Sequence, residues 1–200
     1  GRMFHVDPRV LIPRPSTEGL VELVISLYKK SVQLDAGRWQ QFPIDTGIVA
    51  ATYIKEHAAL PPLVIDVGTG SGCIAVTLAA ERPELRVIAS DISEEALAAA
   101  RENAELHPGN DRILFLQRDA AAVFAAVTEP FLVVSNPPYI PEGTVLPTDV
   151  ARYEPAGALF SGPDGMAVLR PLVTAAMANS LCAGIILECR TEQALALATA

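Results

Sequence analysis

The tetrapeptide Asn136-Pro137-Pro138-Tyr139 is the most distinctive candidate for chemistry in this sequence. It follows an apolar run typical of a buried strand, and ligands of open α/β sheets bind beyond the carboxyl ends of the strands. The two prolines fix their own φ angles and keep Asn136 extended, so the loop is rigid before a substrate arrives. The side-chain oxygen of Asn136 and the carbonyl oxygen of Pro137 can then accept both hydrogens of one planar NH2 group, with the Tyr139 ring against its face.

A glycine-rich turn lies where another apolar strand passes into a helix. Glycines allow positive φ angles and close approach of a ligand, and the helix N-terminus presents free N–H groups. A dinucleotide-binding turn has the spacing G-x-G-x-x-G, whereas here the third glycine comes one residue early, which favours S-adenosylmethionine. A glycine turn without a ligand is the alternative. The candidate cofactor-binding residues are Asp66, Gly68, Thr69, Gly70, Ser71 and Gly72.

Asp91 ends the next apolar run, about twenty residues beyond the glycines. A carboxylate there can accept both hydroxyls of a ribose whose remainder lies over the glycine turn. Because Ser93 follows closely and a helix is predicted after it, a capping or solvated aspartate is the alternative. The glycine turn favours ribose binding.

Together the two loops indicate methyl transfer to nitrogen. An amide or exocyclic amine nitrogen is a poor nucleophile because its lone pair is delocalised. Acceptors for both of its N–H groups stabilise the positive charge that develops as it attacks the sulfonium methyl group in line. We expect Asn136 to border the cofactor as well as the substrate. No histidine base is needed, and we interpret His5, His57 and His107 as surface or structural residues.

Strands that alternate with helices of about ten to fifteen residues are predicted to position these loops. This pattern is typical of right-handed crossovers and a parallel sheet with helices on both faces, so the sequence predicts a doubly wound α/β fold. The expected strands are 63–67, 86–89, 113–116, 131–135 and 184–188. The expected helices are 73–81, 93–107, 120–127 and 166–180.

The pattern before residue 63 is less regular. Residues 10–15 are predicted to be strand-like and broken by two prolines, and Ser16 or Thr17 is predicted to cap a helix that reaches Tyr28. Residues 34–62 are interpreted as a connecting segment, with a short helix over 48–57. We therefore expect an N-terminal strand, helix and connecting segment over 1–62 and an S-adenosylmethionine-binding catalytic domain over 63–200.

Composition narrows the class of protein further. Half of the 200 residues are hydrophobic and 19% are charged, which is typical of one globular domain. The net charge of −8 disfavours a polynucleotide substrate. No apolar run is long enough to span a membrane, and the scattered Cys73, Cys182 and Cys189 predict reduced thiols and no metal site. We expect a cytoplasmic protein.

On these motifs the chain resembles the bacterial HemK/PrmC family, N5-glutamine methyltransferases that act on peptide chain release factors. The I-P-R-P and Y-E-P segments narrow the match, because the other motifs are shared with many amino-methyltransferases. The resemblance includes V-L-I-P-R-P-S-T-E (10–18), D-V-G-T-G-S-G-C-I-A (66–75), S-D-I-S-E-E-A-L (90–97), A-R-E-N-A (100–104), V-S-N-P-P-Y-I (134–140), Y-E-P-A-G-A-L (153–159), G-P-D-G-M (162–166) and L-E-C-R-T-E-Q (187–193).

The resemblance implies a Rossmann-like class I S-adenosylmethionine-dependent methyltransferase fold. It implies that residues 68–72 hold the methionine end of the cofactor, that Asp91 holds its ribose and that Ala120, after Asp119, borders the adenine. Residues 136–139 would grip the glutamine amide of a release-factor loop. The chain departs from the family at Ser16, usually Glu, and at Ala120, often Trp. Residues 34–62 look longer than the usual link, and we expect the family's N-terminal helical domain and final pair of strands to be missing.

Three alternatives stay open. A nucleic-acid methyltransferase acting on adenine or guanine would also use N-P-P-Y, although the acidic charge and the lack of basic runs count against it. A cofactor-binding module without transferase activity is favoured by Ser16 and Ala120 and disfavoured by the intact N-P-P-Y. A dehydrogenase has the least support because of the displaced glycine.

Overall fold

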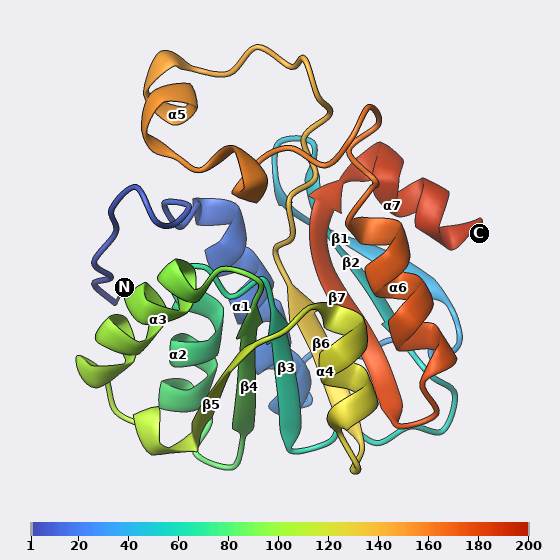
Figure 1. Cartoon of the computed structure of the whole chain (residues 1–200). Coiled ribbons are helices and arrows are strands. Elements are labelled where there is room, and N and C mark those ends of the chain that lie inside the picture. Colours follow the sequence, from blue (N-terminus) through green and yellow to red (C-terminus); the bar gives the residue numbers. More distant parts are fainter. Residues whose placement is uncertain (1, 200) are drawn as a thin grey trace.

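Parallel strands separated by helices form the centre of the molecule, as the sequence predicts (Figure 1). The computed structural model describes residues 2–199. Its seven-stranded sheet has the order β1-β2-β7-β6-β3-β4-β5, and the doubly wound α/β fold is confirmed. The parallel strands are β3 (Leu63–Val67), β4 (Arg86–Asp91), β5 (Ile113–Gln117), β6 (Phe131–Ser135) and β7 (Cys182–Arg190).

Helices cover both faces of this sheet. They are α1 (Pro15–Tyr28), α2 (Cys73–Glu81), α3 (Glu94–Glu105), α4 (Ala120–Ala126), α6 (Leu169–Ala178) and α7 (Thr191–Ala198). Successive side chains of a strand point to opposite faces. In β3, Val64 therefore belongs to the core that α1 and α2 cover, whereas Leu63 and Ile65 belong to the core beneath α4, α6 and α7. α3 packs beside α2, β4 and β5.

Two antiparallel strands extend the sheet beyond β7. β1 (Trp39–Asp45) and β2 (Ile48–Ile54) form a hairpin, and β2 pairs with β7 from Ile48 opposite Arg190 to Ile54 opposite Gly184. The predicted helix over 48–57 is wrong. The run Ile48–Ile54 is apolar at most positions, so periodicity alone does not separate a strand buried on both faces from a helix. The run becomes a strand because β7, the last of the parallel strands, pairs with it along its other edge.

Gly184 lets this hairpin approach β7 closely. A Cβ atom at Gly184 would lie 2.4 Å from Ile54 Cδ1 and 2.7 Å from the Tyr53 carbonyl oxygen. The hairpin comes from the segment before residue 63 but shares one sheet with the later strands. The division of the chain into domains at residue 62 stays a prediction.

The start of α1 also differs from the prediction. Residues 10–14 form no strand, because Pro13 lacks a donor and no neighbouring strand edge pairs with the run. The helix begins at Pro15 with Arg14 as its N-cap residue, so neither Ser16 nor Thr17 caps it. Pro15 is suited to the first helical position by its fixed φ. The hydroxyl groups of Ser16 and Thr17 are left for other partners.

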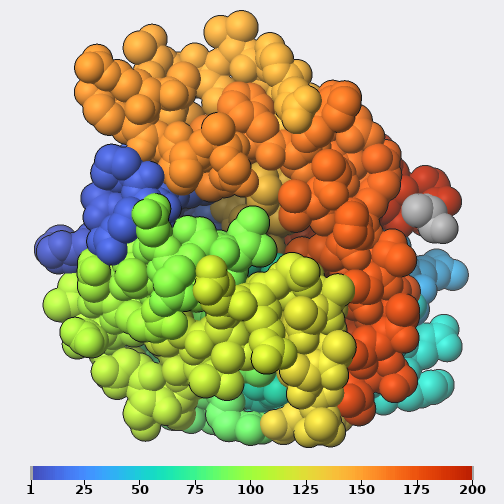
Figure 2. Space-filling view, in the orientation of Figure 1, coloured from blue at the N-terminus to red at the C-terminus, as the bar shows by residue number. Residues whose placement is uncertain are grey.

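The remaining chain gathers at the carboxyl ends of the parallel strands. Residues 141–160, here called the overhang, contain α5 (Thr148–Tyr153) and a short 3₁₀ turn (Ala156–Ala158). Another 3₁₀ turn (Asn110–Arg112) precedes β5. The N-terminal arm, residues 2–14, passes beside α3 (Figure 1). Figure 2 shows the overhang projecting above the arm and α3, with a hollow beneath it.

Candidate active site

The glycines of the turn between β3 and α2 have different surroundings. All three have positive φ angles, of 69° at Gly68, 54° at Gly70 and 80° at Gly72. Among residues 2–199, nothing lies within 4 Å of a Cβ atom built at Gly68 or Gly70, whereas one at Gly72 would lie 3.1 Å from Ala100 Cβ. Gly72 therefore lets α2 pack against α3. Gly68 and Gly70 leave an open stretch of backbone that a ligand can approach.

Asp66 is a fully buried carboxylate behind this turn. Its Oδ2 accepts hydrogen bonds from Thr69 Oγ1 (2.6 Å) and the Ala75 N–H (3.1 Å). Its Oδ1 is buried and has no partner among the described residues. Burial raises the pKa of Asp66 to about 7, the two hydrogen bonds oppose this, and the charge of Asp91 adds to it. The unpaired oxygen suits a ligand that brings a hydrogen-bond donor.

The raised pKa of Asp66 predicts how stability changes with pH. Between the ordinary pKa of 3.8 and the folded value of about 7, the folded protein holds a proton that the unfolded chain has lost. Stability contributed by this group therefore falls as pH rises through that window, by at most about 1.4 kcal/mol per pH unit. Asp66→Asn should flatten this part of the curve. Urea unfolding of both proteins without ligand, from about pH 4.5 to about pH 7.5, measures the slopes; equal slopes would contradict the prediction.

Asp91 lies beside the glycine turn because β4 is the neighbour of β3, with Ser90 opposite Val67. Its Oδ2 accepts a hydrogen bond from the Gly70 N–H and its Oδ1 accepts one from the Ser93 N–H, both at 3.0 Å. Each carboxylate oxygen can accept a further hydrogen bond. The structure thus brings Asp91, at the end of β4, next to the glycine turn that follows β3. Its oxygens can still accept hydrogen bonds from hydroxyl groups.

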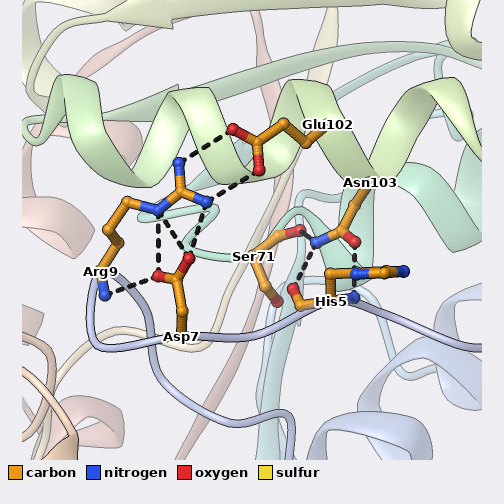
Figure 3. A network of polar contacts seen from close by, with 6 residues as sticks. All are labelled: His5, Asp7, Arg9, Ser71, Glu102 and Asn103. Atoms are coloured by element: carbon orange, nitrogen blue, oxygen red, sulfur yellow. Dashed lines mark hydrogen bonds and ion pairs between the residues drawn. The ribbon is translucent and has the colours of Figure 1, made fainter.

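Asn103 connects the glycine turn to the N-terminal arm, a role that the sequence did not reveal (Figure 3). Its buried side chain donates through Nδ2 to the carbonyl oxygens of Ser71 and His5, both at 2.9 Å, and accepts from the His5 N–H at 2.7 Å. Arg9 of the same arm forms one ion pair with Asp7 inside the arm and another with Glu102, which fastens the arm to α3 (Figure 3). The available signal was a polar residue within the alanine-rich helix around A-R-E-N-A.

Asn136 follows β6, the other neighbour of β3, so it lies beside the glycine turn. Ser135 fixes the start of the loop by donating to the Val67 carbonyl oxygen at 2.5 Å. Pro137 is buried, and Asn136, Pro138 and Tyr139 are half-buried. The Asn136 Nδ2 donates to Thr17 Oγ1 at 2.9 Å. This contact directs the Asn136 Oδ1 away from Thr17.

Glu188 of β7 is fully buried and accepts three side-chain hydrogen bonds at this loop. Ser16 Oγ and the Tyr139 hydroxyl donate to Oε1 at 2.9 Å each, and Thr17 Oγ1 donates to Oε2 at 3.0 Å. Burial raises the pKa of Glu188, and these hydrogen bonds oppose the shift. Sequence reasoning missed Glu188, although a carboxylate at the end of the apolar run 184–188 was an available signal.

A pocket of about 370 Å³ lies between the N-P-P-Y loop and the overhang. Its walls include Leu11, Arg14, residues 136–140, Leu146, Val150 and Glu188. Arg14 forms an ion pair with the buried carboxylate of Glu154 at 2.5 Å. This pair joins I-P-R-P to Y-E-P and so fixes the arm against the overhang at the pocket.

Gly165 lies close against the backbone of the N-P-P-Y loop. Its φ angle is 72°, and a Cβ atom there would lie 2.2 Å from the Tyr139 carbonyl oxygen. The Gln193 Nε2 donates to that oxygen at 2.8 Å. The G-P-D-G-M and T-E-Q motifs therefore hold the backbone of the N-P-P-Y loop.

Asp119 and Ala120 lie after β5, at the same edge of the sheet as Asp91, which is opposite Gln117. Asp119 is exposed and caps α4 by accepting from the Ala122 N–H at 2.8 Å. The half-buried Ala120 begins that helix. Their predicted place beside an adenine stays a prediction.

Residues 2–199 contain neither a candidate metal site nor a candidate membrane-spanning helix. No group of three or more His, Cys, Asp and Glu side chains in this range is arranged to hold a metal ion. No helix in the same range is both long and apolar enough to cross a membrane.

The sheet order, with an antiparallel strand beside the parallel set, and the loops at the parallel strand ends define a class I methyltransferase fold. The catalytic domain of hMettl16, solved in complex with the MAT2A 3'UTR hairpin 6, has the same fold; its TM-score is 0.52 at 14% identity, over 87% of this chain and 56% of that one. The chain belongs to the methyltransferase small domain family, whose model matches residues 44–152.

Similar curated proteins carry a more specific name than this family. The release factor glutamine methyltransferase of Chlorobaculum tepidum is 43% identical over 88% of this chain and 53% of its own length. That of Mycolicibacterium smegmatis is 40% identical over 86% and 51%. The chain spans about half the length of these curated relatives. The resemblance to the HemK/PrmC family that the motifs indicated is confirmed.

Proposed function

We propose that this protein transfers a methyl group from S-adenosylmethionine to the side-chain amide nitrogen of a glutamine in a peptide chain release factor. The observation that carries the proposal is the fixed orientation of Asn136, whose Nδ2 is held by Thr17. Its Oδ1 is thereby free to accept an N–H bond from a substrate beside the glycine turn. The identity of 43% to a release factor glutamine methyltransferase supports the choice of substrate.

The residues around the glycine turn fit the proposed cofactor. The open backbone at Gly68 and Gly70 admits a ligand, and the unpaired Asp66 Oδ1 suits an amino group. Asp91 would accept the ribose hydroxyls, Thr69, Ser71 and Gly72 would shape the turn, and Ala120 after Asp119 would border the adenine. When bound, the cofactor supplies a methyl group made electrophilic by a sulfonium charge.

The N-P-P-Y loop would bind and orient the amide. The Asn136 Oδ1 and the Pro137 carbonyl oxygen would accept the two amide N–H bonds, which draws electron density toward the nitrogen and stabilises its developing positive charge. The Tyr139 ring would pack against the amide plane, held there by its hydrogen bond to Glu188. Fixed acceptors need no reorganisation during the reaction, which is how they lower its barrier.

A transfer assay with methyl-labelled S-adenosylmethionine tests this function. The substrates are a release-factor domain, the same domain with its candidate glutamine replaced by alanine, and a nucleic acid rich in adenine and guanine. We expect label in the intact domain alone. Label in the nucleic acid would favour the nucleic-acid alternative, and equal label in both protein substrates would place the modified atom elsewhere. Cofactor binding without transfer to any of them would favour a binding module.

A further inference from the structure

We propose that Glu188 is a positioning residue that fixes which way the Asn136 side-chain amide faces. This inference rests on the proposed function, because the orientation matters for an amide substrate. Glu188 does not contact Asn136 among the described hydrogen bonds; the two are linked through Thr17. The chain of contacts runs from β7 through the start of α1 to the loop after β6.

The direction of each hydrogen bond in this chain follows from the charge of Glu188. A carboxylate has no proton to donate, so Thr17 Oγ1 must donate its only hydroxyl proton to Glu188 Oε2. The Thr17 oxygen can then act only as an acceptor toward Asn136. An asparagine amide carries a donor and an acceptor side that sterics alone do not distinguish. The NH2 side must therefore face Thr17, and Oδ1 must face away from it.

The Glu188 carboxylate also positions Tyr139, whose ring is proposed to pack against the substrate amide. The Tyr139 hydroxyl donates to Glu188 Oε1, and Ser16 Oγ donates to that oxygen as well. Glu188 is fully buried, so water does not replace a lost donor. Ser16 thus supplies a third donor to the buried carboxylate. One buried charge orients both Asn136 and Tyr139.

Glu188→Gln can reverse the direction of these hydrogen bonds because glutamine brings its own NH2 donor. If that NH2 group donates to Thr17 Oγ1, the Thr17 proton is released toward Asn136 and favours the flipped amide. A flipped Asn136 presents NH2 to the NH2 group of the substrate. Turning it back costs about one hydrogen bond, so we expect kcat for methyl transfer to fall about tenfold. Cofactor affinity, measured by calorimetry, should change less than about twofold.

Substitutions at Thr17 test the link independently of Glu188. Thr17→Val keeps the shape but removes the hydroxyl group, and Thr17→Ser keeps the hydroxyl group. We expect Thr17→Val to lose about as much kcat as Glu188→Gln, Thr17→Ser to lose clearly less, and the Glu188→Gln/Thr17→Val pair to lose little more than either change alone. Additive losses, or equal losses in Thr17→Ser and Thr17→Val, would overturn the proposal.

Glu129→Gln is the matched control for loss of a carboxylate charge. The side chain of Glu129 is 43% exposed, pairs with Arg86 and precedes β6 at the opposite end of the sheet. Its replacement should leave transfer unchanged. An equal loss in this variant would mean that Glu188→Gln acts through net charge, and would overturn the proposal.

An NMR measurement without substrate separates this inference from the proposed function. In the wild type the Asn136 side-chain NH2 protons should show nuclear Overhauser effects to Thr17, and these should weaken in Glu188→Gln. If the wild-type signals are present and lost in the variant, Glu188 orients Asn136 even if the release factor is not the substrate. If they are unchanged in the variant, the orientation does not depend on Glu188 and the inference is wrong.

Discussion

Replacing Asn136 with alanine lowers the rate of methyl transfer by about two to three orders of magnitude, the expected effect of losing one preorganised polar contact at a reacting centre. The substitution removes the acceptor Oδ1 and the contact of Nδ2 with Thr17 Oγ1. Cofactor affinity should fall far less, because the glycine turn and Asp91 stay in place. Single-turnover transfer to a release-factor domain measures the rate, and calorimetry measures the affinity.

Asn179→Ala is a matched control for this variant. Asn179 follows α6 at the opposite end of the sheet, where its Nδ2 donates to the Phe124 carbonyl oxygen and its Oδ1 accepts from the Leu181 N–H. Its loss removes two structural hydrogen bonds without touching the candidate site. We expect it to lower stability but to keep the transfer rate of the folded protein. Full activity in Asn136→Ala would show that N-P-P-Y is only a turn.

Replacing Asp91 with alanine should weaken binding of S-adenosylmethionine at least tenfold. Each charge-assisted hydrogen bond from a ribose hydroxyl contributes about 1.5–3 kcal/mol, and about 1.4 kcal/mol corresponds to a factor of ten. The substitution also removes acceptors from the Gly70 and Ser93 N–H groups, so the turn itself is loosened. Calorimetric titration with the demethylated product measures the change without turnover.

Ser93→Ala is a control for loss of local stability beside Asp91, because it keeps both backbone hydrogen bonds that Asp91 accepts. Ser93 caps α3 by accepting from the Ala96 N–H at 3.1 Å. Loss of such a cap costs about 1 kcal/mol of stability but removes no proposed ligand contact. We expect its cofactor affinity to match the wild type. Unchanged affinity in Asp91→Ala would mean that the ribose lies elsewhere, and tighter binding of NAD than of the cofactor would end the methyltransferase interpretation.

Local chemistry explains why much of this protein is predictable from its sequence. The apolar runs around β3 and β6 are short, bounded by glycine or proline and followed by polar residues, so each indicates a buried strand with a loop at its carboxyl end. Parallel strands place all such loops at one edge of the sheet. That rule places the glycine turn, Asp91 and Asn136 at the same edge, and the strand order, with β4 and β6 on either side of β3, makes them neighbours.

The segment 34–62 shows where local patterns fail. Residues of β2 are apolar on both faces because α1 covers one face and α7 covers the other. The strands β1 and β7 that pair with it cannot be inferred from the run itself. Helix and strand are then equally compatible with the pattern. The choice depends on a pairing with residues more than a hundred positions later.

The sequence by itself determined the α/β class, the two loops and the residue types that could bind a cofactor and an amide. Only the tertiary structure decided that Ser16 and Thr17 serve Glu188 rather than cap α1, that Arg14 pairs with Glu154, and that Asn103 joins the arm to the glycine turn. The physical reason is that a side chain's local spacing reports its own backbone conformation, whereas a hydrogen-bond partner 171 residues away, as for Thr17 and Glu188, is chosen by the packing of separate elements.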